Sequence, residues 1–264
     1  APTNVLELLR SGGHHFLGND GEDIVAFGHG SAFHYLSKTP VIQGDGTFKC
    51  VVLPYTQLYI LHGVVANAVA FPFLFCLVKG KTQDVYVRLL RLVERLANDR
   101  GTTVFQRPVQ VVTDFEKSFM NALGQYAAGQ SLVCCFFHFA ANIRKRSTPI
   151  MTAIKCAAGE NAAMVRLAEK TKRAVMMLPF LPAELIDPDV VAAIFGRWTA
   201  AYEDHRNAFD DLREHVLDNY VMPGARFPVR NWSVSGRKVR TNNAAESSHS
   251  RLNASIRVSG AVTL

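Results

Sequence analysis

Apolar residues come in short runs along the first half of the chain, separated by turn residues. Three runs, at residues 41–53, 57–65 and 71–78, follow one another closely and predict three sequential strands. Short links between such strands are typical of an antiparallel meander. The segment from Val51 to Val78 contains no Asp, Glu, Lys or Arg, but its Pro, Gly and polar residues suit buried strands and turns better than a membrane-spanning helix.

Helical and strand patterns then alternate. Apolar residues recur at helical spacing from Gln83 to Asp99, and Thr82 can cap this helix. Residues 109–113 predict a fourth strand, 115–126 a second helix and 132–136 a fifth strand. The order β-β-β-α-β-α-β is that of a ribonuclease-H-like core without its last helix. We therefore expect an α/β fold built on a mixed five-stranded sheet.

The composition becomes helical after His138, which predicts an all-α insertion. Prolines interrupt this part, and Pro149 is expected to separate helices at 139–146 and 151–157. A final helix begins near Asn243. We predict four parts, which are a lead-in segment (1–40) with a polar loop at 14–23, the first part of the core (41–138), the insertion (139–225), and a basic loop with a C-terminal helix that completes the core (226–264).

Charge and cysteine content narrow the function classes. The net charge of +7 favours a polyanionic partner, most often nucleic acid. Five cysteines are an odd number, and they do not form the disulfide framework of a small secreted domain, so we expect a reducing compartment. The chain opens on an amphipathic segment rather than a signal peptide.

Three acids suggest a metal site. Asp45 stands between Gly44 and Gly46 in an apolar strand, where an unpaired buried charge would be costly, although Gly-Asp-Gly is also common in turns. Asp114 follows the fourth strand, and Glu246 falls in the first turn of the final helix. Two acids on a sheet and one on a late helix can hold two Mg²⁺ or Mn²⁺ ions. Glu116 is a rival to Asp114, but acids are favourable in a first helical turn for electrostatic reasons alone.

A set of motifs occurs in the order found in one family. The stretch Gly44–Lys49 is followed by His62-Gly63, Gly80-Lys81-Thr82, Thr113–Glu116, Cys135–Phe139 and Arg240–Glu246 with His249. From about residue 24 onward, this set resembles a Mutator-like element (MULE) transposase domain. The resemblance implies a DDE-type core with Asp45, Asp114 and Glu246 as catalytic, metal-binding acids and a helical insertion before the last catalytic helix.

The implied reaction is DNA transposition. Two Mg²⁺ ions per active site, with Mn²⁺ as a substitute, would support hydrolysis of DNA strands at the transposon ends and transfer of the 3′-hydroxyl into target DNA. The implied partners are double-stranded DNA and further copies of the chain, with no membrane, and the location is the nucleus if the source is a eukaryote. Two other hypotheses stay open: a host-adopted, transposase-derived DNA-binding protein that does not cut, and a metal-dependent nuclease on the same fold.

Three further residues are expected to support the acids. Cys135 and His138 form a C-x-x-H that could be half of a zinc site, but no second Cys/His pair follows at a finger-like distance. In similar transposases this pair lies close to the catalytic acids, and its alternative is a buried thiol with a hydrogen-bonded core histidine. His249, three residues after Glu246, lies on the same helix face and could orient it.

Two basic runs are expected to bind DNA. No acid occurs between Asp218 and Glu246, while basic residues accumulate there, as in a phosphate track. Trp232 could stack on a flipped base, whereas core packing is favoured for Trp198. The predicted DNA-binding residues are Arg144, Lys145, Arg146, Arg230, Trp232, Arg237, Lys238 and Arg240.

Overall fold

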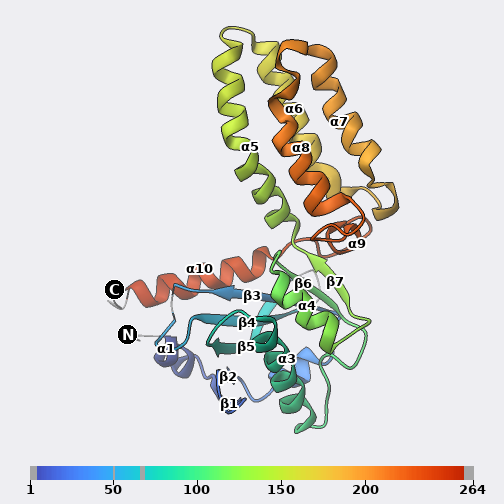
Figure 1. Cartoon of the computed structure of the whole chain (residues 1–264). Coiled ribbons are helices and arrows are strands. Elements are labelled where there is room, and N and C mark those ends of the chain that lie inside the picture. Colours follow the sequence, from blue (N-terminus) through green and yellow to red (C-terminus); the bar gives the residue numbers. More distant parts are fainter. Residues whose placement is uncertain (1–4, 50, 66–68, 259–264) are drawn as a thin grey trace. The chain divides into compact units, whose positions relative to one another are not determined.

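The computed structural model describes residues 5–49, 51–65 and 69–258. Within these ranges, the side chains of residues 5, 8, 243–246 and 255–258 lie outside the description. The chain forms two compact units, one of residues 1–132 and 241–264 and the other of residues 133–240 (Figure 1). The second unit is wider at both ends than the predicted insertion, 139–225.

A mixed sheet organises the first unit. Its seven strands in the described part of the chain follow the order β1-β2-β5-β4-β3-β6-β7. The strands are β1 (His15–Asn19), β2 (Ile24–Gly28), β3 (Val41–Thr47), β4 (Gln57–Val64), β5 (Ala70–Val78), β6 (Gln110–Thr113) and β7 (Ser131–Cys134). In this order, every pair of neighbouring strands from β1 through β2, β5 and β4 to β3 is antiparallel, and β3 is parallel to β6. The α/β class and the predicted antiparallel meander are confirmed.

The expected number of five strands was too low. The predicted polar loop at 14–23 contains β1, which pairs with β2, and β2 continues the sheet beyond β5. All five residues of β1 are exposed or half-buried, because this strand lies at the edge of the sheet and bulges between Phe16 and Gly18. An edge strand can be exposed on both faces and then shows no alternation of apolar and polar residues, so its composition resembles that of a loop. The predicted lead-in segment is therefore part of the sheet.

Helices α3 (Gln83–Asn98) and α4 (Lys117–Tyr126) cover one face of the sheet. The spacing of Val85, Leu89 and Leu92 buries one side of α3, as predicted. Thr82 caps this helix by accepting a hydrogen bond from the Val85 N–H at 3.3 Å, which confirms the predicted cap. Tyr59 of β4 packs between the two helices, with its ring stacked on Phe119.

Helices α1 (Val5–Ser11) and α10 (Asn243–Val258) lie on the opposite face. Leu9 of α1 and Leu252 of α10 pack against Leu58, Ile60 and Phe75. The short helix α2 (Ala32–Leu36) packs on the same hydrophobic core as α3 and α4. Within the described residues, no helix is long and apolar enough to cross a membrane. The acid-free run 51–78 instead supplies β4 and β5, and Cys76, Cys134, Cys135 and Cys156 are not in disulfides.

The second unit is helical, as predicted. Its main helices are α5 (Phe136–Ala158), α6 (Ala162–Met177), α7 (Pro188–Ala201), α8 (Asp210–Val216) and α9 (Val229–Trp232). Shorter 3₁₀ turns occur at Leu178–Phe180, Ala183–Leu185 and Glu203–Phe209, and a π turn at Leu217–Val221. Trp198 is fully buried in this unit, and its indole N–H donates to the His205 carbonyl at 2.8 Å, which confirms core packing.

The predicted helix break at Pro149 was wrong. Helix α5 continues through this residue. A proline inside a helix leaves the carbonyl of the preceding turn without its amide donor. Pro149 and Lys145 are both exposed, so water can solvate that carbonyl. Upstream, the Thr148 hydroxyl donates to the Arg144 carbonyl at 2.9 Å and adds a side-chain hydrogen bond to the same turn.

Candidate active site

Asp45 lies in the central strand β3, and the two glycines beside it face the other side of the sheet. Its carboxylate is 7% exposed and accepts a hydrogen bond from the Gly46 N–H at 2.9 Å. Side chains alternate along a strand, so Gly44 and Gly46 point toward the helix α3 side. A Cβ atom at Gly44 would lie 2.6 Å from the Tyr59 hydroxyl, and one at Gly46 would lie 2.6 Å from Gln57 Oε1. The glycines therefore let β3 pass closely over two buried polar side chains.

This close approach predicts a loss of stability in the variant Gly44→Ala. The added methyl group must displace the fully buried Tyr59, and overpacking of this kind costs about 1–3 kcal/mol. Chemical denaturation of the parent and the variant measures the difference. Gly124→Ala is the matched control, because its Cβ meets nothing within 4 Å and it lies in helix α4, where alanine stabilises by about 0.5–1 kcal/mol. Equal stabilities of Gly44→Ala and the parent would contradict this packing.

Asp114 lies beside Asp45 at the end of the neighbouring parallel strand. The last ladder pair joins Gln43 of β3 to Val112 of β6; Asp45 follows two residues later in β3, and Asp114 is the first residue after β6. Adjacent strands run about 4.8 Å apart. The backbone thus brings the two predicted acids to the same end of two neighbouring strands. The Thr113 hydroxyl donates to the Asp114 carboxylate at 3.4 Å.

The segment leading into α10 is fixed on β3. The Gln43 side-chain amide donates to the Thr241 carbonyl at 3.0 Å, and the Asn242 amide donates to the Gly44 carbonyl at 3.5 Å. Further along α10, His249 Nδ1 lies 3.4 Å from Asp45 Oδ2. Glu246 is in the same helix, three residues before His249, but its side chain lies outside the described residues. The contact of His249 is with Asp45, whereas the sequence predicted that it would orient Glu246.

His62 of β4 is a neighbour of this site that the sequence prediction missed. It is fully buried, and its ring centroid lies 6.4 Å from that of His249. Burial, followed by the nearby His249, lowers the pKa of His62 to about 3. Burial also lowers the pKa of His249 to about 4 and outweighs the attraction of the Asp45 carboxylate. Both imidazoles are therefore neutral near pH 7.

Glu116, the rival of Asp114, belongs to a different polar network. Its carboxylate is hydrogen-bonded to the Tyr86 hydroxyl, which also accepts from the Gln57 amide at 3.1 Å. Tyr86 belongs to the core on the α3 side of the sheet, opposite the face that carries Asp45. Burial, and to a smaller extent the Asp114 charge, raises the pKa of Glu116. Glu116 therefore contacts the polar network on the α3 side, whereas Asp45 contacts His249 of α10.

Cys135 and His138 belong to the second unit. Cys135 is fully buried at the N-cap of α5, and His138 is half-buried in its first turn. Their approach to the acids stays a prediction. Among the described residues there is no group of three or more His, Cys, Asp or Glu side chains that could hold a metal ion. The predicted acid triad falls outside this finding, because the Glu246 side chain is not among the described residues.

The predicted DNA-binding residues also lie in the second unit, and Trp232 requires a correction. Trp232 is fully buried, stacked on Phe139 at 5.0 Å, and its indole N–H donates to the carbonyls of Tyr220 and Phe227. This core position contradicts the prediction that its ring stacks on a base. The basic side chains are exposed, apart from the half-buried Arg237, and comprise Arg144, Lys145, Arg146, Arg230, Arg237, Lys238 and Arg240.

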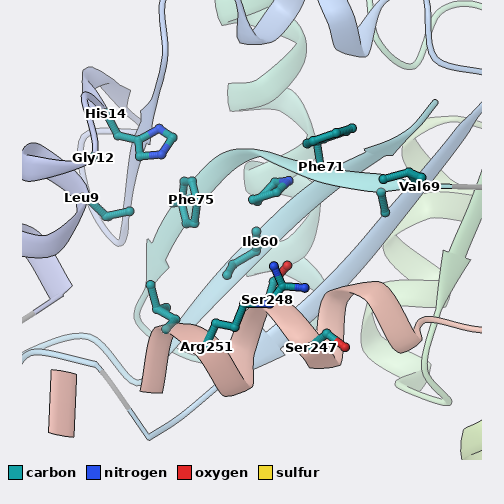
Figure 2. Close-up of a pocket in the computed structure, with 13 residues that line it drawn as sticks. Leu9, Gly12, His14, Ile60, Val69, Phe71, Phe75, Ser247, Ser248 and Arg251 are labelled. Atoms are coloured by element: carbon teal, nitrogen blue, oxygen red, sulfur yellow. The ribbon is translucent and has the colours of Figure 1, made fainter. Parts of the chain in front are cut away.

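A pocket of about 630 Å³ lies on the α10 face of the sheet (Figure 2). Ile60 in its wall is the cross-strand neighbour of Asp45, and Phe71 and Phe75 come from β5. From α10 the pocket takes Ser248 and Arg251, whereas neither Asp45 nor His249 lines it. The residues of α10 that line the pocket therefore differ from His249, the α10 residue that contacts Asp45.

The fold and the site define a class, an α/β domain with two carboxylates at the ends of neighbouring parallel strands. Residues 41–142 match the family model of the MULE transposase domain. This match supports the predicted family, and Asp45 and Asp114 lie inside it while Glu246 lies beyond it. A comparison of the chain with curated proteins gives no match. The matched family indicates a transposase-related function in general terms.

Proposed function

We propose that this chain is the catalytic core of a DDE-type transposase, with Asp45, Asp114 and Glu246 as its three acids. The observation that carries the proposal is that Asp45 and Asp114 each follow, by two residues, the last ladder pair of two neighbouring parallel strands. Ligands of mixed α/β sheets gather at the carboxyl ends of central strands, where both residues lie. Glu246 would supply the third carboxylate from α10, one helical turn before the residue that contacts Asp45.

A ribonuclease-H-like core is the fold we infer for the first unit. The order β5-β4-β3-β6-β7, with β3 antiparallel to β4 and parallel to β6, supports it. Helices α3 and α4 follow β5 and β6 in the predicted sequence of elements. Strands β1 and β2 would be additions to the edge of this core, and residues 133–240 would be the helical insertion.

The donor set fits divalent metal ions. Asp45 and Asp114 would each offer carboxylate oxygens, which Mg²⁺ and Mn²⁺ favour as ligands. When bound, two such ions would activate the attacking oxygen and stabilise the leaving oxygen. Asp45, Asp114 and Glu246 would hold them, and the neutral His249 would keep the Asp45 carboxylate in place.

The reaction would have two stages at one site. In the first, a water oxygen attacks a phosphodiester at the transposon end, and the strand leaves with a free 3′-hydroxyl. In the second, that hydroxyl oxygen attacks a target phosphodiester and displaces another 3′-oxygen, so that one ester bond forms as one breaks. The exposed basic side chains of the second unit would hold the DNA phosphates. Assembly of several copies and a nuclear location in a eukaryote remain part of the proposal.

A calorimetric Mn²⁺ titration tests the metal site. We expect saturable binding by the parent chain and at least about tenfold weaker binding by Asp114→Asn, because the variant loses one charged ligand. Asp99→Asn, which changes an exposed acid at the far end of α3, is the matched control and should bind as the parent does. Each titration is repeated with a short duplex present. Equal Mn²⁺ binding by the parent and Asp114→Asn, with and without the duplex, would overturn the proposed site.

A further inference from the structure

An exposed aromatic ring and a lysine form a pair beyond the carboxyl end of β3. The Phe48 side chain is 50% exposed, and the Lys81 ammonium lies 3.6 Å from the centre of its ring. Phe48 comes from the loop after β3, and Lys81 from the loop between β5 and α3. We call these two residues the Phe48–Lys81 platform. A half-exposed ring beside a cation leaves part of its surface accessible to a ligand.

The loop that carries Lys81 is fixed by hydrogen bonds. The Gly80 N–H donates to the Thr56 hydroxyl at 2.7 Å, and the Gln57 amide donates to the Gly80 carbonyl at 2.7 Å. Thr82 then caps α3, whose positive N-terminal end follows Lys81 directly. A helix N-terminus and a lysine side by side favour a bound anion such as a phosphate group.

The platform lies at the same end of the sheet as the two acids. Phe48 follows Asp45 by three residues, and β3 ends between them. A DNA strand whose phosphate reached Asp45 and Asp114 would therefore pass the platform within a few nucleotides.

We propose that the Phe48–Lys81 platform binds an unpaired nucleotide of the DNA strand that enters the acid site. The Phe48 ring would stack on the base, and Lys81 would contact the adjoining phosphate. Stacking accepts any base because every base has a π face, so the platform would favour unpaired ends without reading their sequence. The inference rests on the proposed function for the identity of the strand, and it assigns DNA contacts to the first unit.

The surrounding charges limit the path of that strand. Lys79 is tied to Asp23 at 3.9 Å and to the Glu22 carbonyl at 3.0 Å, so we leave it out of the platform. Arg88 is surrounded by four acids, which are Asp20, Glu22, Asp23 and Asp84. This group carries excess negative charge and repels phosphates. We therefore expect the strand to pass Phe48 and Lys81 rather than this acidic group.

Fluorescence binding without divalent metal tests the platform. The probe is a short duplex with an unpaired 3′ end that carries 2-aminopurine, a base whose emission falls when it stacks. With the parent chain we expect quenching on binding. Phe48→Ala should lose the quenching and bind the unpaired end about 5- to 150-fold more weakly, while Phe48→Trp keeps both. Lys81→Gln should lower the slope of log affinity against log salt by about 0.7.

Phe16→Ala is the matched control, because Phe16 is 58% exposed on the edge strand β1. It should leave quenching and affinity unchanged. Unchanged quenching in Phe48→Ala, or an equal loss of affinity for blunt duplex and unpaired end, would overturn the platform. The assay contains no metal and involves no cleavage, so it is independent of the acids. If Asp45→Asn left cleavage unchanged while Phe48→Ala lost unpaired-end binding, the proposed function would fail and the platform would stand.

Discussion

Replacing Asp45 with Asn should lower divalent-metal-dependent DNA cleavage by about 100- to 10,000-fold. The amide has the size of the carboxylate and keeps an oxygen for the Gly46 N–H, so the strand should fold as before. It lacks the negative charge that a metal ion needs, and metal stabilisation of a transition state is worth several kcal/mol. Cleavage of a labelled duplex containing a candidate element end, in Mg²⁺ and in Mn²⁺, measures the rate.

Asp99→Asn controls for the loss of one acid, since Asp99 is exposed at the end of α3. This control should cut at the parent rate, and circular dichroism should show that both variants are folded. A cleavage rate in Asp45→Asn equal to that of the parent would remove Asp45 from the active site. The neighbouring positions of Asp45 and Asp114 would then have no role in catalysis.

Replacing Glu94 with Ala should cost about 3–5 kcal/mol of unfolding free energy. The Glu94 carboxylate is 1% exposed and accepts hydrogen bonds from the Val104 N–H at 3.1 Å and the Phe105 N–H at 2.7 Å. The Thr103 hydroxyl donates to it as well. Its removal leaves two backbone donors without a partner beside buried residues, and each such group costs about 1–3 kcal/mol.

Urea denaturation followed by tryptophan fluorescence and circular dichroism measures this loss. Glu94→Gln keeps one acceptor oxygen in place, so it should retain roughly half of the stability that Glu94→Ala loses. Asp99→Ala, at the exposed end of the same helix, should change the stability by less than about 0.5 kcal/mol. If Glu94→Ala changed the free energy of unfolding by less than about 0.5 kcal/mol, the backbone N–H groups of Val104 and Phe105 would have to form hydrogen bonds with other acceptors.

The elements that could be predicted are those whose periodicity is strong and local. Helix α3 begins at the predicted Gln83 and ends one residue before the predicted Asp99, because its apolar spacing and its Thr82 cap agree. Strands β4 and β5 follow from acid-free apolar runs between turn residues. The family resemblance added the order of the motifs, and with it the prediction that Asp45 and Asp114 act together.

What could not be predicted depends on tertiary surroundings. Strand β1 is an edge strand whose pairing with β2 is invisible in a polar sequence. Burial decides the state of His62; the apolar run around it predicts a buried strand, but not that its ring lies beside His249. Trp232 lies in a basic loop by sequence, yet Phe139 and Tyr220 surround its ring in the folded unit. Local composition describes the neighbours along the chain, and in these cases the neighbours in space decide the role.

The hydrogen bond between Gln43 and Thr241 joins residues 198 positions apart, and it has a consequence during synthesis. Ribosomes add about 5–20 residues per second, so Thr241 emerges about 10–40 s after Gln43. Until then, Leu58, Ile60 and Phe75 lack the cover that Leu252 provides. A nascent or prematurely terminated chain thus exposes this apolar face to chaperones, and it carries Asp45 and Asp114 without α10. The order of translation itself delays completion of the site until the helical unit has left the ribosome.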